Sequence, residues 1–285
     1  MTTSGGGPAK IVVAWDGSRA SATAFPAARV IASQLGAGVE ILHVVAKDAP
    51  KDAIESAVRE VGLDGLADCR LRVEAGDADA EILRAVEDAE VQLVLLTTHG
   101  GAIERGRQLG RVVERVIVGA SKPLVLIRPE APLVQRQLAR LLLPVDGTPK
   151  TATALRPAAE LAGKLGACLD LLYIAPAAGA PPTEIGSIGA PRYVDQQQHE
   201  WPNWAAEAAE RFAACCASCP PEIEVQMFFA HGDIGLEIER FAVEHDSDAI
   251  VLVRRSRLQP GRARVLRAVL GRSSLPILMC SGPEG

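Results

Sequence analysis

Short runs of apolar residues alternate along the chain with longer segments in which apolar residues recur every three or four positions. The runs are typical of strands buried on both faces of a parallel sheet, and the longer segments are typical of amphipathic helices. Helices are predicted over residues 18–36 and 77–90. Strands are predicted at residues 10–15, 39–46, 69–75, 92–97 and 123–127. Strands that alternate with helices predict a parallel sheet covered by helices, which binds ligands beyond the carboxyl ends of its strands.

The second half of the chain repeats this pattern. Asp16-Gly17-Ser18 aligns with Asp146-Gly147-Thr148, which lies 130 residues later, and Gly76 aligns with Gly232, which lies 156 residues later. The second copy is therefore 26 residues longer between these landmarks. Such a duplication predicts two domains of the same fold.

We place the first domain at residues 9–130 and the second at residues 138–281. The extra residues of the second copy fall at about 176–204, where Pro, Gly and Gln are frequent. This composition is typical of an irregular insertion rather than of a core element.

Composition narrows the choice of partners. The 285 residues are 48% hydrophobic and carry a formal net charge of −5. This balance argues against nucleic-acid or anionic-membrane binding, which usually requires excess Lys and Arg. No apolar stretch reaches the ~18 to 20 residues of a membrane span, and residues 1–10 lack the pattern of a signal peptide. We expect a cytoplasmic protein without a membrane or nucleic-acid partner.

The six cysteines are irregularly spaced, which favours reduced thiols over a disulfide framework. Cys215, Cys216 and Cys219 form the sequence CCASC. No second Cys or His cluster at ligand spacing completes a metal site with them, so we predict no metal.

Three aspartates precede predicted helices. Asp16 follows the first strand, and its carboxylate suits either an N-cap of the next helix or a contact to ligand hydroxyls. Ser18 and Thr148 are competent N-caps themselves. Asp77 and Asp233 each follow a glycine and precede an amphipathic helix, so N-capping is predicted for both.

The segment after the fourth predicted strand carries most of the candidate chemistry. It reads LLTTHGGAIERGRQLGRVVERV from residue 95 and has glycines at 100, 101, 106 and 110. Glycine-rich backbone before a helix N-terminus is suited to binding an anion. The chain contains no Walker sequence, no nucleophile elbow and no carboxylate–histidine set at catalytic spacing. We therefore predict a binding protein rather than an enzyme, with weak ATP hydrolysis not excluded.

These features together resemble a tandem universal stress protein, with two copies of the domain over residues 9–281. The strand-Asp-Gly-Ser opening, the Gly-Asp before the third helix, the glycine loop and the closing ERVIVGASKPLVLIRP carry the resemblance. It implies two tandem Rossmann-like α/β domains of the adenine nucleotide alpha hydrolase type, each a five-stranded parallel sheet flanked by helices. It also implies frequent dimer formation, here as a homodimer or an intrachain pseudo-dimer.

In one branch of that family, ATP is bound by a loop that reads Gly, two residues, Gly, nine residues, Gly, then Ser or Thr. The first copy keeps this spacing, but Thr97 replaces the first glycine and Arg111 replaces the hydroxyl residue. Arg111 is either a substitute phosphate ligand or a solvent-exposed side chain. The resemblance implies an ATP site, with Mg²⁺ only as a companion of the nucleotide. Its residues would be Ala14, Asp16, Val44, Thr97, Gly100, Gly110, Arg111 and Val112.

The second copy departs further from the loop. It has five residues where nine are expected, and Ala263 aligns with Gly110. Six arginines between residues 254 and 267 form either a site for an acidic partner or a solvated basic surface. Two hypotheses follow. The protein is a stress-response regulator whose N-terminal domain binds an adenine nucleotide, or it is a dimerisation and interaction protein that binds none.

Overall fold

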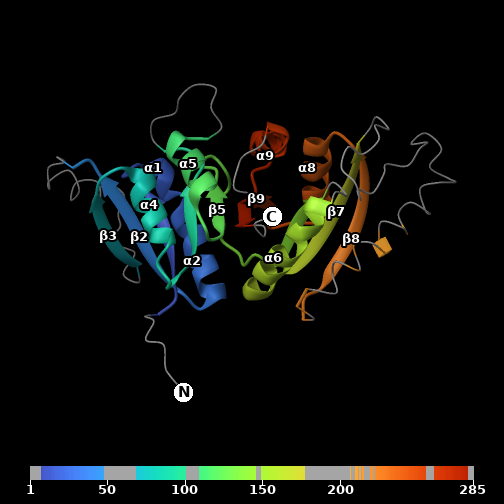
Figure 1. Cartoon of the computed structure of the whole chain (residues 1–285), viewed down its shortest axis with the longest axis horizontal. Helices are drawn as coiled ribbons and strands as arrows, with labels where there is room; N and C mark the ends of the chain where they lie inside the picture. Colours follow the sequence, from blue (N-terminus) through green and yellow to red (C-terminus); the bar gives the residue numbers. More distant parts are fainter. Residues whose placement is uncertain are drawn as a thin grey trace, which may run out of the picture. The chain divides into compact units, whose positions relative to one another are not determined.

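The computed structural model describes residues 8–47, 69–100, 109–145, 149–176, 222–254 and 260–281, with isolated positions between 206 and 220 (Figure 1). Contacts divide the chain into two units. Unit 1 comprises Met1–Gln137 with Ser274–Met279, and unit 2 comprises Leu138–Ser273 with Cys280–Gly285. The contacts thus group residues 274–279 with the first half, whereas the sequence placed them in the second domain. The limits 9–130 and 138–281 stay a prediction.

Unit 1 is a parallel sheet flanked by helices, as the sequence predicts. Its strands follow the order β3-β2-β1-β4-β5. Each predicted strand is confirmed to within one residue at either end. The strands are β1 (Lys10–Trp15), β2 (Gly38–Val45), β3 (Cys69–Ala75), β4 (Val91–Thr97) and β5 (Leu124–Ile127). Ile11, Val12 and Val13 are all fully buried, so both faces of β1 are covered.

Four described helices belong to unit 1: α1 (Arg19–Ala22), α2 (Ala24–Leu35), α4 (Ala78–Val86) and α5 (Arg111–Gly119). The single helix predicted over residues 18–36 is divided at Thr23. Pro26 explains the division, because it has no N–H to donate to the carbonyl four residues earlier. Thr23 instead donates its hydroxyl to the Ala20 carbonyl, at 2.7 Å.

One strand of unit 1 comes from the far end of the sequence. The first residues of β10 (Ile277–Ser281) pair antiparallel with β5, with Ile277 opposite Leu126 and Met279 opposite Leu124. The repeat led us to expect a parallel fifth strand of the second domain in this segment. The α/β fold is confirmed, with β10 as an antiparallel addition to the parallel strands of unit 1.

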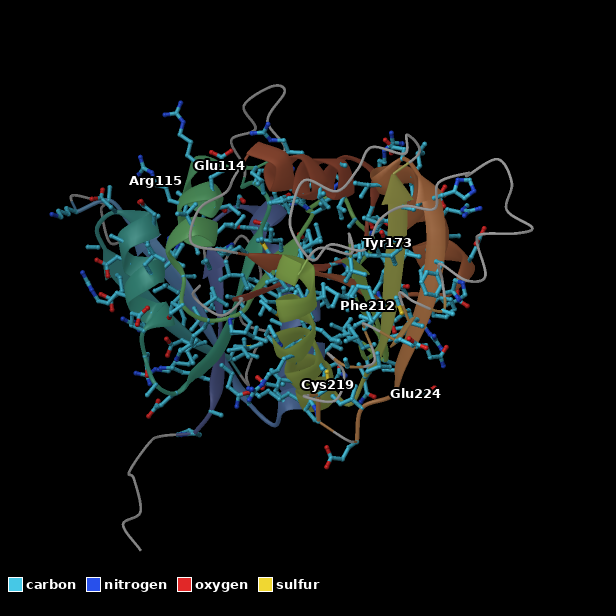
Figure 2. All side chains as sticks on the ribbon, turned by 45° about the vertical axis from the view of Figure 1, so that its right-hand side comes forward. Glu114, Arg115, Tyr173, Phe212, Cys219 and Glu224 are labelled. Carbon is cyan, nitrogen blue, oxygen red and sulfur yellow. The ribbon has the colours of Figure 1, made fainter. Side chains whose placement is uncertain are left out.

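The described part of unit 2 has four parallel strands in the order β9-β6-β7-β8. These are β6 (Arg140–Val145), β7 (Cys168–Pro176), β8 (Val225–Gly232) and β9 (Ala249–Arg254). Its helices include α6 (Pro149–Leu165), α8 (Ile234–Glu244) and α9 (Pro260–Arg272). Buried Tyr173 packs against Phe212, with ring centroids 6.3 Å apart (Figure 2). The predicted insertion at about 176–204 lies, except for Pro176, outside the described residues.

Each unit holds an ion pair between a half-buried cation and a buried carboxylate at the amino ends of its strands. In unit 1, Lys10 Nζ lies 3.4 Å from a carboxylate oxygen of buried Glu40. Lys10 also lies 2.8 Å from Asp88, and their hydrogen bond raises the pKa of Lys10 and lowers that of Asp88. In unit 2, Arg140 lies 3.0 Å from fully buried Asp170. Both pairs stand at the opposite ends of the strands from the expected ligand site.

Candidate functional site

A cavity of about 300 Å³ lies at the carboxyl ends of β1, β2 and β4 and at the start of α5. All eight residues predicted for the adenine nucleotide site line it: Ala14, Asp16, Val44, Thr97, Gly100, Gly110, Arg111 and Val112. The structure thus brings together residues that are up to 98 positions apart in sequence. Their role in binding stays a prediction.

Asp16 directly follows the carboxyl end of β1, and hydrogen bonds from two serines hold its carboxylate in place. Its Oδ1 accepts the Ser18 N–H at 3.0 Å, the Ser18 hydroxyl at 2.5 Å and the Ser21 hydroxyl. The N-cap of α1 is Ser18, whose hydroxyl accepts the Ser21 N–H at 3.1 Å. The Asp16 carboxylate therefore organises the turn, while a neighbouring side chain caps the helix.

Gly100 is where the loop after β4 meets that carboxylate. A Cβ placed on Gly100 would stand 1.8 Å from Asp16 Oδ2 and 2.8 Å from its Cγ. Any side chain at position 100 would force the carboxylate out of its place. Glycine is thus required by the close approach of the two loops.

The N-terminus of α5 faces the cavity through Arg111, Val112 and Val113. Its N-cap is Gly110, which has no side chain to accept the N–H groups of the first turn. The Gly110 N–H itself donates to the Thr98 carbonyl at 2.8 Å. A helix N-terminus without a capping side chain carries partial positive charge and is a suitable site for an anion.

The two residues that differ from the family loop sit differently in the cavity wall. Thr97 is the last residue of β4 and is only 5% exposed, so its side chain occupies space that a glycine would leave open. Arg111 is exposed at the first position of α5. Both interpretations of Arg111, as an anion ligand or as a solvated side chain, are compatible with that position.

Sequence reasoning missed two polar residues of the cavity wall, Ser21 and His99. The His99 ring places Nε2 2.9 Å from Glu130 Oε1, and its buried Nδ1 has no hydrogen-bond partner among the residues that the structure describes. His99 falls between Thr97 and Gly100, within the loop that the spacing had marked. Ser21 gave a weaker signal, a second hydroxyl three residues after Ser18. Neither contact, to Glu130 or to Asp16, follows from spacing alone.

The remaining helix and cysteine predictions have mixed outcomes. Asp77 and Asp233 are both N-cap residues, but only Asp233 uses its side chain, which accepts the Leu236 N–H at 3.0 Å. The four described cysteines form no disulfide with one another, and the expected reduced state stays a prediction. Cys215 and Cys216 lie outside the described residues, and the described part of the chain holds no group of three or more metal-ligating side chains.

The basic segment 254–267 falls mostly outside the described side chains, as do Asp146 and Thr148 of the second copy. The interaction of that segment with an acidic partner stays a prediction. Among the described helices, none has the length and apolar character needed to cross a bilayer.

A parallel sheet with covering helices defines a Rossmann-like α/β fold. A match between the sequence and a family model identifies the family. The model of the universal stress protein family matches residues 8–128 and 138–281, and the chain therefore belongs to the universal stress protein family as a tandem of two such domains. No curated protein sequence matches the chain.

Solved structures show the same fold over both units. A universal stress protein from Archaeoglobus fulgidus superposes with a TM-score of 0.64 and 18% identity, covering 95% of this chain and 98% of that one. A functionally unknown protein from Pseudomonas aeruginosa gives a TM-score of 0.58 and 14% identity, covering 96% and 93%. At such identities the likeness extends to the fold alone.

Proposed function

We propose that unit 1 binds an adenine nucleotide, with ATP as the first ligand to test, and that the protein acts as a stress-response regulator through this binding. One observation carries the proposal. The eight predicted residues line a single cavity, onto which an α-helix N-terminus without a capping side chain opens. The loop pattern is known from other proteins of the family, whereas the cavity is observed in the structure of this chain.

The cavity lining combines apolar, carboxylate and cationic groups. Ala14 and Val44 give an apolar surface for a purine ring, and Asp16 gives carboxylate oxygens for hydroxyl groups. Gly110 and the first turn of α5 face the position of a phosphate, and Arg111 adds a positive charge there. Mg²⁺ would enter only with the nucleotide phosphates.

Calorimetric titration of the full chain with ATP and Mg²⁺ tests the proposal. Arg111→Gln is expected to lower ATP affinity about tenfold, because a charge-assisted contact is worth about 1.5 kcal/mol. The matched control is Arg115→Gln on the same helix. Arg115 pairs with Asp79 at 3.0 Å, is absent from the cavity lining, and is marked on α5 in Figure 2. Its removal should leave ATP affinity unchanged.

The alternative is an interaction protein that binds no nucleotide. Acid extraction of the purified protein separates the two, since co-purified adenine nucleotide supports binding. If millimolar ATP gives neither heat nor a thermal shift, the nucleotide proposal fails. Light scattering then tests the predicted homodimer or pseudo-dimer.

A further inference from the structure

We propose that Ser21 is a positioning residue of this site, whose hydroxyl holds the Asp16 carboxylate so that Oδ2 is presented at the Gly100 edge of the cavity. The inference rests on the proposed nucleotide function. It names the part of the ligand that the carboxylate recognises, a ribose with free hydroxyl groups.

Ser21 contacts Asp16 directly, and its hydroxyl also lies 3.1 Å from both the carbonyl oxygen and the hydroxyl of Ser18. It is 2% exposed, it lines the cavity, and it reaches Asp16 from the single turn of α1. Its hydroxyl donates to Asp16 Oδ1 and also accepts the Asp16 N–H at 3.3 Å. One buried side chain therefore holds both the backbone and the carboxylate of Asp16.

Helix capping does not account for this arrangement. The N-cap of α1 is Ser18, which already accepts the Ser21 N–H. The Asp16 carboxylate, in contrast, takes three donors on one oxygen, Oδ1. Rotation of the carboxylate would break all three bonds, so the direction of Oδ2 is fixed with them.

Gly100 defines the same carboxylate position from the opposite side. The Cβ clash of 1.8 Å shows that Oδ2 stands against the glycine backbone at the cavity wall. Ser21 and Gly100, 79 positions apart in sequence, thus restrict one carboxylate from two directions. A carboxylate oxygen is an acceptor only, so it suits a ligand with hydroxyl donors, and a nucleoside offers its ribose hydroxyls.

The second repeat retains hydroxyl residues at the two equivalent positions. Thr148 and Thr151 follow Asp146 at the spacing by which Ser18 and Ser21 follow Asp16. Threonine is therefore a conservative replacement for Ser21, because the second repeat has Thr151 at the equivalent position.

Titration with ATP and with 2′,3′-dideoxyATP tests the inference in the full chain. Ser21→Ala should weaken ATP binding about 5- to 20-fold, which is the range expected for the coupling between two residues in contact, here Ser21 and Asp16. It should leave the binding of dideoxyATP unchanged. Ser21→Thr should bind ATP within about twofold of the parent, because it restores the hydroxyl. Ser33→Ala, an exposed serine of α2, is the matched control and should bind both ligands as the parent does.

A double-mutant cycle isolates the route through Asp16. In an Asp16→Ala background, Ser21→Ala should have no further effect on ATP affinity. Equal weakening of ATP and dideoxyATP by Ser21→Ala would show that Ser21 only supports α1, and unchanged ATP binding would also overturn the inference. If the parent chain binds neither nucleotide, the proposed function itself fails.

Discussion

The two units resemble each other more closely at the amino ends of their strands than at the carboxyl ends. Lys10 and Glu40 of unit 1 correspond, 130 residues later, to Arg140 and Asp170 of unit 2, and both pairs are formed. Both pairs consist of a half-buried cation and a buried carboxylate, although arginine replaces lysine and aspartate replaces glutamate in unit 2. The amino ends of the strands therefore keep one electrostatic arrangement in both copies.

The helix that follows the third strand shows the same agreement. Glu81 pairs with Arg84 at 2.5 Å in α4, and Glu237 pairs with Arg240 at 2.6 Å in α8. Gly76 precedes the first pair and Gly232 the second, and in each case the glutamate side chain packs against the glycine. A Cβ at these positions would stand 2.9 Å from Glu81 Oε1 and 3.3 Å from Glu237 Oε1, and Gly232 also has a φ of 134°, which favours glycine.

The carboxyl ends of the strands differ. β1 pairs with β4 as far as Val13 opposite Leu95, whereas β6 pairs with β9 only as far as Leu142 opposite Ile250. Pro144 stands where unit 1 has Ala14, and its missing N–H removes a donor from the ladder. The two units therefore agree at the amino ends of these strands and differ at the carboxyl ends.

The largest expected effect concerns the buried pair of unit 2. Asp170→Ala should lower the free energy of unfolding by about 2 to 3 kcal/mol, below the usual loss for a fully buried pair because Arg140 is 34% exposed. Glu40→Ala should cost less, about 1 kcal/mol, since Lys10 keeps Asp88 at 2.8 Å. Urea unfolding measures both. Equal losses would contradict the difference drawn between the two pairs.

The next effect makes the unit 1 site resemble unit 2. Gly100→Ser installs the residue found 156 positions later and should weaken ATP binding about 10- to 100-fold, because Asp16 must leave its donors. Gly38→Ser is the matched control. A Cβ there meets only the Ala9 carbonyl oxygen, at 3.9 Å, and calorimetry should show unchanged affinity. If Gly100→Ser keeps full ATP affinity, the position of the Asp16 carboxylate does not contribute to ATP binding.

A smaller effect depends on pH. The Lys10 hydrogen bond lowers the pKa of Asp88, so its stabilisation is present above the unfolded pKa of about 3.9 and is lost as pH falls through the lower folded value. The raised pKa of Lys10 acts oppositely, and its stabilisation is lost as pH rises through the folded value above about 10.5.

Lys10→Met should therefore lower stability near neutral pH by up to about 1 kcal/mol and reduce the further loss as pH falls below about 4. Unfolding measured across that range checks it. Lys164→Met, at an exposed position of α6, serves as the control and should keep the acid loss of the parent. An unchanged acid dependence in Lys10→Met would rule out this pair as its source.

The smallest effect tests the agreement between the copies. Arg84→Ala and Arg240→Ala each remove an exposed partner three residues from a glutamate, and each should cost about 0.2 to 0.5 kcal/mol. Thermal unfolding of the two variants should give similar small shifts. If one variant loses several times more stability than the other, the two ion pairs have the same geometry but contribute differently to stability.

Sequence patterns predicted the strands of unit 1 because apolar runs bounded by Gly and Asp are local signals. The eight cavity residues were predicted from the resemblance to the universal stress protein family, and the structure places them around one cavity, while their role in binding stays a prediction. Sequence patterns could not predict the break at Thr23, where Pro26 overrides a continuous amphipathic pattern. Contacts such as His99 with Glu130, 31 positions apart, depend on how loops meet after folding.

The pairing of β10 with β5 has a consequence for synthesis on the ribosome. Residues 124–127 emerge about 150 residues before their antiparallel partner, which at roughly 5 to 20 residues per second is a delay of about 8 to 30 s. Throughout that interval the nascent first half has an apolar strand edge without the neighbour it has in the finished protein, and such edges promote aggregation. A chaperone that shields strand edges would therefore be needed most before translation reaches residue 277.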